Sequence, residues 1–330
     1  MSRIAVLGAG AWGTALALSL VRQQRHSVLL WGHTPSHVEA MERSRENSRY
    51  LPDFRFPEGL RLCSSLQQAA HEADVLLLVT PSEHVRSTVG ALATFLNAKH
   101  SIVSASKGIE EESFLRVSEI VAALTDVPFA ALGGPSFARE VAAALPTAVT
   151  LAAQDNSVAR GLQQDFSSSS LRVYTNQDVT GVELGGALKN VIALAAGVVA
   201  GLELGSNAAA ALVTRGMAEI TRLAVACGAH PATMAGLAGY GDLVLTCTGT
   251  LSRNRSVGVE LGRGRSLADV LGGLNGKVAE GVRCTGAALG LAERHSIHLP
   301  IASEMYSILH RGRSPREAID ALMTRPARDE

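Results

Sequence analysis

The sequence predicts an α/β fold with a mostly parallel sheet over residues 1–180, followed by an all-α domain over residues 181–330. In the first part, short continuous apolar runs alternate with helix-like segments, which is typical of a parallel sheet covered on both faces. From about residue 181, long apolar helices rich in alanine and glycine replace this alternation, and we expect no further strand. A chain of 330 residues is long enough for two domains, each with its own core.

A glycine motif joins the first predicted strand to the first predicted helix. Residues 3–7 form an apolar strand, residues 8–13 read Gly-Ala-Gly-Ala-Trp-Gly, and residues 14–20 continue as an apolar helix. This is G-x-G-x-x-G in the context that a Rossmann-like, dinucleotide-binding unit requires. Gly8 allows the tight turn, Gly10 lets a pyrophosphate approach the backbone, and Gly13 lets helix and strand pack closely. The helix N-terminus then offers free N–H groups to the phosphates.

The end of the second predicted strand, residues 28–31, lacks the acidic side chain that an NAD-specific site usually carries. Gly32-His33-Thr34 follows instead, so a 2′-phosphate would meet no negative charge there and the site can admit NADPH. His33 either donates to that phosphate or caps the strand. Trp12 and Tyr50 are candidates to line the cofactor.

The remaining predicted strands end in small, polar or basic residues. These strands cover residues 74–79, 101–104, 129–132, 148–151 and 171–174. In a parallel sheet, ligands bind beyond the carboxyl ends of the strands. Thr80, Ser106, Lys107, Gly134 and Ser136 lie at such ends. Lys107 either reaches a substrate carbonyl or phosphate, or lies on the surface.

The second domain is expected to contain helices and glycine-rich loops. Helical patterns cover residues 182–202, 208–227, 267–271, 284–295 and 315–323. The last begins with Ser314-Pro315-x-Glu317, a typical helix start. We expect no membrane insertion, because the longest apolar stretch, residues 191–202, is too short to cross a bilayer.

Composition argues against several classes of function. Formal net charge is zero and aromatic content is 4%, so nucleic-acid binding is not expected. The four cysteines form no C-x-x-C pair, which indicates free thiols in a reducing compartment. The histidines show no metal-ligand spacing, so no metal is expected. The N-terminus leads into the first strand without a signal-peptide pattern, and we expect a cytoplasmic protein.

Lys189 and Asp242 are the candidates for proton transfer. Lys189 interrupts the long apolar segment, where a lysine needs a partner or a task, unless it extends from the helix end toward solvent. The preceding Gly185 and Gly186 weaken a helix but let a ligand or another backbone come close. Asp242 lies between a glycine and an apolar run, where it either orients Lys189 and accepts its proton or caps a helix.

Ser252-Arg253-Asn254 is a candidate phosphate site. Arginine presents a planar fork of donors that matches phosphate oxygens, and Ser252 and Asn254 add neutral donors. A solvated basic loop is the alternative interpretation.

Taken together, these segments resemble the bacterial-type NAD(P)-dependent glycerol-3-phosphate dehydrogenases over nearly the whole chain. The glycine motif is weakly specific, whereas the lysine segment and the Arg-Asn segment, in this order, are much more so. Family members often have an arginine at or next to the position of His33, and this chain has none there. The matching segments are residues 8–15, 106–109, 133–138, 181–190, 239–243, 252–254 and 278–281.

The resemblance implies reversible hydride transfer between sn-glycerol 3-phosphate and dihydroxyacetone phosphate with NADPH or NADH. It also implies a homodimer that supplies glycerophospholipid synthesis. Lys189 is then the proton acceptor in oxidation and the proton donor in reduction, together with Asp242. The implied substrate contacts are Lys107, Gly134, Ser136, Lys189, Asp242, Ser252, Arg253 and Asn254. The implied cofactor contacts beyond the three glycines are Ala11, Trp12, His33, Tyr50, Lys107, Ala138, Arg253, Val278 and Glu280.

Two other functions fit part of the sequence. A related dehydrogenase with the same domain order could act on a hydroxy acid or ketoacid, because a carboxylate substrate could also use Arg253. A nicotinamide-binding regulator without catalysis would keep the glycine motif but would need neither Lys189 nor Asp242. A screen of substrates separates the first alternative, and cofactor binding without turnover identifies the second.

Overall fold

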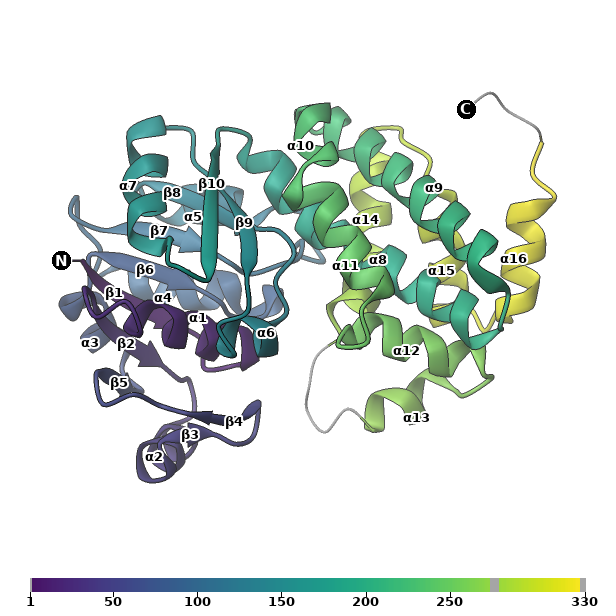
Figure 1. Ribbon diagram of the computed structural model, residues 1–330. Coiled ribbons are helices and arrows are strands. Elements are labelled where there is room, and N and C mark those ends of the chain that lie inside the picture. The colour runs from purple at the N-terminus through teal and green to yellow at the C-terminus, as the bar shows by residue number, and fades with distance from the viewer. Residues whose placement is uncertain (1, 274–278, 327–330) are drawn as a thin grey trace. The chain divides into compact units, whose positions relative to one another are not determined.

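The computed structural model describes residues 2–273 and 279–326 (Figure 1). The chain forms two compact units, one of residues 1–107 with 115–183 and one of residues 108–114 with 184–330. The predicted boundary at residue 180 lies within one long helix, α8 (Val179–Gly201), which the structure divides between Glu183 and Leu184. The short segment 108–114 belongs to the second unit, which the strand and helix pattern did not indicate.

The first unit contains an eight-stranded sheet in the order β10-β9-β8-β7-β6-β1-β2-β5. All neighbouring strands are parallel except β8 and β9, so the prediction of a mostly parallel sheet is confirmed. The strands are β1 (Arg3–Leu7), β2 (Ser27–Trp31), β5 (Leu60–Cys63), β6 (Val75–Leu78), β7 (Ser101–Ser104), β8 (Phe129–Gly133), β9 (Thr147–Ala152) and β10 (Leu171–Asn176).

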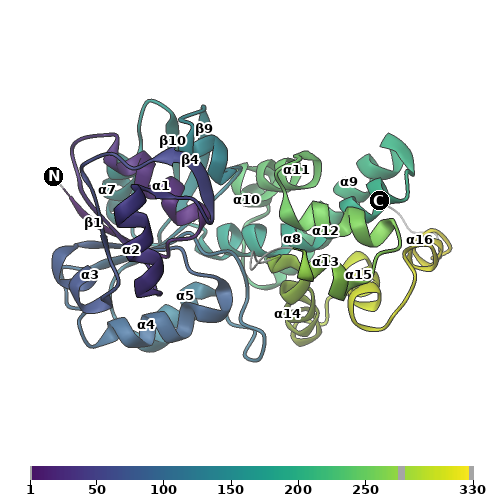
Figure 2. The ribbon, with the colours of Figure 1, turned by 90° about the horizontal axis from the view of Figure 1, so that it is seen from below.

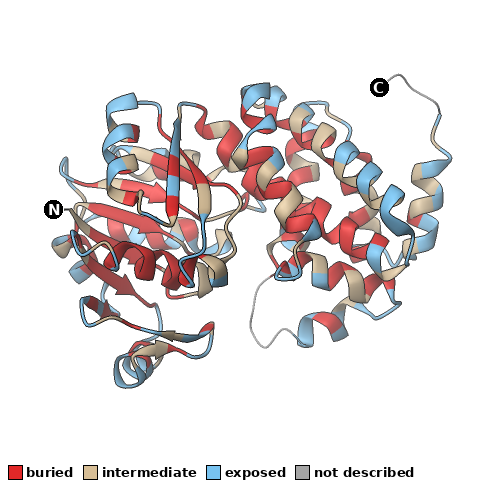
Figure 3. Ribbon diagram, viewed as in Figure 1, coloured by how far each residue is buried: buried red, intermediate tan, exposed pale blue. Residues whose placement is uncertain are grey.

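Helices cover both faces of this sheet. Ile4 and Val6 of β1 belong to a core with residues of α1, α6 and α7, whereas Ala5 and Leu7 belong to a second core with α3, α4 and α5. Figure 3 shows the central strands in the buried colour, as expected for strands with two apolar faces. The helices are α1 (Ala11–Val21), α2 (Pro35–Ser44), α3 (Leu66–Glu72), the short η1 (Ser82–His84), α4 (Val85–Ala93), α5 (Val117–Leu124), α6 (Ala138–Ala142) and α7 (Asn156–Phe166).

Three strands were not anticipated from the sequence. β5 is short and carries the exposed Arg61, so it lacks a continuous apolar run. β3 (Glu46–Asn47) and β4 (Leu51–Arg55) form a separate two-stranded sheet. Their sequence is largely polar and contains Pro52, so it lacks the continuous apolar run that predicts a strand. Leu51 and Phe54 nevertheless pack against the core that contains Ile4 and Val6, and Asn47 bonds to Ala9 and Thr14.

The second unit is all-α in the residues that the structure describes, as predicted (Figures 1 and 2). Its last helix begins with the expected capping box, in which Ser314 and Glu317 bond to each other's backbone N–H groups. After α8, its helices are α9 (Gly205–Ala226), α10 (Pro231–Ala235), the π-helical turn η2 (Leu237–Gly241), α11 (Asp242–Thr248), α12 (Arg253–Gly262), α13 (Leu267–Gly272), α14 (Glu280–Arg294), α15 (Pro300–His310) and α16 (Pro315–Met323).

The length predicted for the apolar stretch of α8 was wrong. The helix has 23 residues and is long and apolar enough to cross a membrane by those criteria alone. However, 89% of its most apolar window is buried inside the structure. This is the burial expected of a core helix, and α8 contributes apolar residues within 184–198 to the hydrophobic core of the second unit.

Glycines bring the backbones of α8 and α12 into direct contact. A Cβ added at Gly197 would lie 2.1 Å from the Arg255 carbonyl oxygen, and one at Gly258 would lie 2.0 Å from the Leu194 carbonyl oxygen. Gly201 and Gly262 repeat this contact one turn farther along each helix. No other residue type fits at such a crossing, so these glycines fix where α12 begins relative to Lys189 on α8.

The surroundings of two glycines, one in this contact and one on the surface, predict opposite effects of a change to alanine. Gly258→Ala inserts a methyl group between packed backbones, so we expect the free energy of unfolding of its unit to fall by at least about 2 kcal/mol. Gly161 is exposed in α7, with no heavy atom within 4 Å of an added Cβ, so Gly161→Ala should raise stability by about 0.5–1 kcal/mol. Urea unfolding measures both changes, and a Gly258→Ala variant as stable as the original chain contradicts the packing argument.

Candidate active site

The glycine loop between β1 and α1 has the geometry that a dinucleotide needs. Gly8 has a φ of +129°, and a Cβ there would lie 2.7 Å from the Val79 carbonyl oxygen. A Cβ at Gly13 would lie 1.9 Å from the Gly8 carbonyl oxygen, whereas Gly10 faces open space within 4 Å. The first and third glycines are therefore required by the turn and the packing. The second leaves room for a pyrophosphate to approach the backbone.

Unpartnered polar groups surround this loop. Gly10 begins α1 without a side-chain cap, and the first turn contains no acidic residue, so its N–H groups and dipole favour an anion. Within the described ranges, the buried atoms Trp12 Nε1, Trp31 Nε1 and Thr80 Oγ1 have no hydrogen-bond partner. Buried polar atoms normally have partners, so these atoms indicate that a polar ligand completes this part of the chain. The residues present fit an NAD(P) dinucleotide.

Lys107, Ser136 and Gly134 converge on one carbonyl group in the first unit. Lys107 Nζ donates to the Gly134 carbonyl oxygen at 3.5 Å, and Ser136 Oγ donates to the same oxygen at 2.9 Å. Gly134 has a φ of +123°, and an added Cβ would lie 3.1 Å from Val149 Cα, so this turn requires glycine. Ala138, also expected at the cofactor, begins α6 just after this turn.

The ion pair between Lys189 and Asp242 is the main feature of the second unit. Lys189 is 5% exposed and Asp242 is 1% exposed, and Lys189 Nζ donates to Asp242 Oδ1. Lys189 therefore does not extend into solvent. Two buried charges stabilise each other, and removing either one leaves the other without compensation at a cost of about 3–5 kcal/mol.

Close backbone packing places Asp242 opposite Lys189. A Cβ added at Gly185 of α8 would lie 2.5 Å from the Ala238 carbonyl oxygen, and one at Gly239 would lie 2.1 Å from the Met234 carbonyl oxygen. The π-helical turn η2 therefore rests directly on α8 and leads into α11, whose first residue is Asp242. The expectation that Gly185 lets another backbone approach is confirmed.

Two hydrogen bonds of the buried Asn254 amide fix the start of α12. Asn254 Nδ2 donates to Asn190 Oδ1 at 2.9 Å, and the backbone N–H of Gly281 donates to Asn254 Oδ1 at 3.0 Å. Ser252 Oγ caps α12 by accepting from the backbone N–H of Arg255, while Arg253 remains exposed. Ser252 and Asn254 thus hold the turn that presents Arg253.

Asn190 is a site residue that the sequence interpretation missed. It is 5% exposed and ties α8 to α12 directly beside Lys189. The available signal was its position, because residues 184–202 contain no polar side chain other than Lys189 and Asn190. Of the residues expected at the cofactor, Glu280 begins α14 and is half-buried, whereas Val278 lies outside the described residues.

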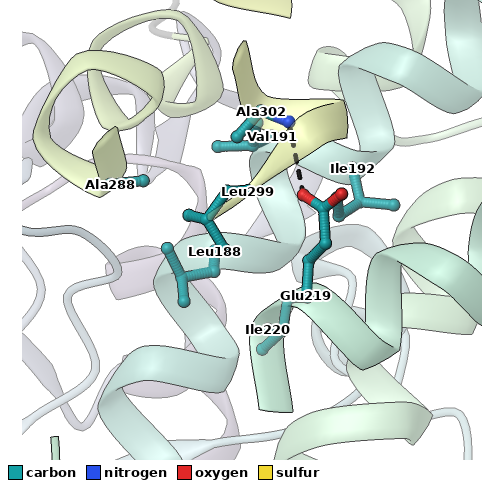
Figure 4. A pocket seen from close by; sticks show the side chains of 8 residues that line it. All are labelled: Leu188, Val191, Ile192, Glu219, Ile220, Ala288, Leu299 and Ala302. Atoms are coloured by element: carbon teal, nitrogen blue, oxygen red, sulfur yellow. Dashed lines mark hydrogen bonds between the residues drawn. The ribbon is translucent and has the colours of Figure 1, made fainter. Parts of the chain in front are cut away.

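A small cavity lies on another face of α8 and contains one buried carboxyl group (Figure 4). Glu219 of α9 is 5% exposed and accepts from the backbone N–H groups of Ile301, at 2.8 Å, and Ala302, at 3.4 Å, in the first turn of α15. Burial raises the pKa of Glu219 to about 7, against the lowering effect of those hydrogen bonds. The other lining residues are apolar: Leu188, Val191, Ile192, Ile220, Ala288, Leu299 and Ala302.

The cysteines and the metal-binding residue types add no site. Cys63, Cys227, Cys247 and Cys284 form no disulfide, and burial raises the pKa of the Cys247 and Cys284 thiols to about 12. Such thiols stay protonated near neutral pH and are unreactive. In the part of the chain that the structure describes, no group of three or more His, Cys, Asp or Glu residues gathers as a candidate metal site.

Comparison with known proteins matches both units. A model for the N-terminus of NAD-dependent glycerol-3-phosphate dehydrogenase matches residues 3–159, and a model for its C-terminus matches residues 178–320. A glycerol-3-phosphate dehydrogenase [NAD(P)+] of Acidobacterium capsulatum is 54% identical over 100% of both chains. The crystal structure of glycerol-3-phosphate dehydrogenase from Coxiella burnetii has a TM-score of 0.94 and 41% identity, and the match covers 98% of this chain and 99% of that one.

A more distant likeness shows a shared fold alone. A PanE/ApbA family ketopantoate reductase from Ralstonia eutropha JMP134 is 18% identical, with a TM-score of 0.60, over 96% of this chain and 99% of that one.

Glu219 predicts a specific pH dependence of stability. Its pKa is about 7 in the folded chain and near 4.5 when unfolded, so between these values the folded state holds a proton that the unfolded state releases. The stability that Glu219 contributes is therefore present below pH 4.5 and is lost as pH rises through 7. Over this range, the free energy of unfolding of Glu219→Gln should rise relative to that of the original chain, by up to about 3 kcal/mol. Urea unfolding from pH 5 to 8 measures this gain, and parallel stability curves contradict it.

Proposed function

The chain belongs to the NAD-dependent glycerol-3-phosphate dehydrogenase family, and from this membership we propose how its residues reduce dihydroxyacetone phosphate reversibly to sn-glycerol 3-phosphate. It is an NAD(P)-dependent oxidoreductase, which uses NADH or NADPH. The observation that carries the proposal is the ion pair of Lys189 and Asp242, which keeps an ammonium group inside an apolar core. Lysine is rarely buried without such a partner or task.

Lys189 is the proton donor for reduction. When hydride adds to the ketone carbon, negative charge develops on the carbonyl oxygen, and the Lys189 ammonium stabilises it and then gives up a proton from Nζ. In the oxidation direction, neutral Nζ accepts the alcohol proton. Asp242 holds the ammonium in one position and balances its charge. The bound nicotinamide supplies or accepts the hydride.

Arg253 binds the substrate phosphate. It is exposed in the first turn of α12, where the helix dipole adds to its charge, and its guanidinium can bond two phosphate oxygens at once. Ser252 fixes this turn by capping the helix, and Asn254 fixes it by its hydrogen bond to Asn190. Binding energy gained at the phosphate, away from the reacting carbon, then holds the carbonyl in place for reaction. Lys107, Gly134 and Ser136 contribute substrate contacts from the first unit.

The cofactor is assigned mainly to the first unit. The glycine loop and the first turn of α1 bind the pyrophosphate, and the residues after β2 and in the β3–β4 hairpin bind the adenosine end. The proposed contacts are Gly8, Gly10, Ala11, Trp12, Gly13, His33, Tyr50, Lys107, Ala138, Arg253, Val278 and Glu280.

Both alternative functions are less well supported. Membership of this family over nearly the whole chain favours a phosphorylated ketone over a hydroxy acid or ketoacid. A cofactor-binding regulator would have no use for a buried lysine–aspartate pair. The direct test mixes the protein with dihydroxyacetone phosphate and either NADPH or NADH and follows cofactor oxidation. Cofactor binding without any oxidation overturns the proposal.

The cellular setting is also part of the proposal. We place the reaction in the cytoplasm, where its product supplies glycerophospholipid synthesis, and we expect a homodimer that neither inserts into membranes nor binds nucleic acid. The support is likeness to the family and the balanced net charge. Light scattering of the purified protein tests the assembly.

Replacing Lys189 should abolish most turnover while leaving cofactor binding intact. In Lys189→Ala, loss of the proton donor is expected to lower kcat by a factor of at least about 10²–10⁴. Because this variant leaves the Asp242 charge buried alone, Lys189→Ala with Asp242→Asn serves as the control that restores stability without restoring activity. NADPH titration and steady-state kinetics measure both properties. Near-normal kcat in Lys189→Ala removes Lys189 from the reaction.

Replacing Arg253 should mainly harm the use of the phosphorylated substrate. We expect Arg253→Ala to lower kcat/KM for dihydroxyacetone phosphate by a factor of about 10² or more, from loss of charge-assisted hydrogen bonds. Arg263→Ala is the matched control, since Arg263 is an exposed arginine just beyond the other end of α12 that pairs with Glu260. An unchanged kcat/KM in Arg253→Ala shows that the phosphate is bound elsewhere.

A further inference from the structure

The β3–β4 hairpin is fastened to the glycine loop by one buried amide. Asn47 is 0% exposed, and its Nδ2 donates to the Ala9 carbonyl oxygen at 2.9 Å and to Thr14 Oγ1 at 2.8 Å. Its Oδ1 accepts from the backbone N–H of Tyr50 at 3.2 Å. Ala9 belongs to the glycine loop and Thr14 to α1, so Asn47 fixes the turn of the hairpin, residues 48–50, against the place assigned to the dinucleotide.

Arg49 lies in this turn and faces the start of α2. Its guanidinium carbon is 5.1 Å from the centroid of the Tyr50 ring, and the Tyr50 ring meets the His37 ring edge-on at 5.4 Å. His37 is in the first turn of α2, which begins just after β2. Arg49 is exposed and, among the residues with described positions, no carboxylate forms an ion pair with it.

Arg49 brings a positive charge to the start of α2. No acidic residue lies in the segment Gly32-His33-Thr34 or in the first turn of α2. Burial lowers the pKa of His37, and the nearby Arg49 charge lowers it further, so the Arg49 charge acts on the first turn of α2. The 2′ position of the adenosine ribose binds at the end of the second strand in folds of this type, and there an arginine accommodates a 2′-phosphate.

We propose that Arg49 binds the 2′-phosphate of NADPH and determines the preference for NADPH over NADH, while Asn47 holds its hairpin in position. The inference rests on the NAD(P)-binding part of the proposed function and not on the substrate. It assigns the selectivity to the β3–β4 hairpin, across from the end of β2, where the chain has a histidine and no arginine.

The test compares cofactor binding, without turnover, in Arg49→Ala. Calorimetric titration with NADPH, NADH, adenosine 2′,5′-bisphosphate and ADP separates the 2′-phosphate from the rest of the cofactor. We expect Arg49→Ala to weaken the binding of NADPH and of the 2′,5′-bisphosphate by about 10- to 100-fold. The binding of NADH and ADP should weaken by less than about 3-fold. Arg49→Lys should recover part of the difference, because it keeps the charge but not the fork.

Arg139→Ala is the matched control, since Arg139 is exposed, lies over the Phe54 ring of the same hairpin and pairs with Asp53. We expect it to change none of the four affinities by more than about 3-fold. Equal weakening of NADPH and NADH in Arg49→Ala would show that Arg49 contacts a shared part of the cofactor and would overturn the proposal. Unchanged NADPH affinity would also overturn it.

Asn47→Ala tests the anchoring role separately. Because the Asn47 amide also fixes the glycine loop, we expect this variant to weaken the binding of NADPH and NADH equally. Arg49→Ala, in contrast, should weaken the binding of NADPH alone. Unchanged affinities in Asn47→Ala would remove Asn47 from the account. If the original protein binds NADPH selectively but does not reduce dihydroxyacetone phosphate, the proposed function fails while the assignment of Arg49 stands.

Discussion

The buried ion pair between Lys189 and Asp242 is the interaction on which the arrangement of the second unit depends. A charged pair in an apolar core is stable only if both groups meet in a fixed geometry. That geometry requires α8 and the turn η2 to touch, which glycine at 185 permits, while Gly239 lets η2 pack closely on Met234 of α10. A second set of glycines brings α12 against α8, and the Asn190–Asn254 hydrogen bond fixes its first turn. The chain thus uses backbone contact, rather than large side chains, to place the buried Lys189 and the exposed Arg253 on one rigid framework.

Backbone contacts at glycines also shape the candidate cofactor site of the first unit. Its sheet gives the glycine loop a rigid base, and backbone contacts at Gly8 and Gly13 leave Gly10 open. The buried polar atoms around this loop have no partner in the described part of the protein, so the unit is built to be completed by a polar ligand. The hairpin that Asn47 fastens to the loop extends this surface, and its arginine supplies a charge that the end of β2 lacks.

The sequence allowed the elements with strong local patterns to be predicted. The β1–α1–β2 unit follows from glycine spacing, and the all-α second unit follows from long apolar helical runs. The sequence did not reveal the features that depend on contacts between residues distant in the chain. Asn47 and Glu219 look ordinary in sequence, and Asn190 differs from its neighbours only in being polar; the roles of all three arise from hydrogen bonds to the glycine loop, α15 and α12. The antiparallel pairing of β8 and β9 and the assignment of residues 108–114 to the second unit are likewise tertiary properties without a local signal.

The central claim is that the Lys189 ammonium group itself delivers the proton to the substrate oxygen. Chemical rescue tests this claim most directly, since a small primary ammonium ion can occupy the space that a truncated lysine leaves. Reduction of dihydroxyacetone phosphate by Lys189→Ala should speed up with increasing ethylammonium and should not respond to tetramethylammonium, which has no proton to give. A rate that ethylammonium leaves unchanged, in a variant that still binds NADPH and the substrate, would contradict the account.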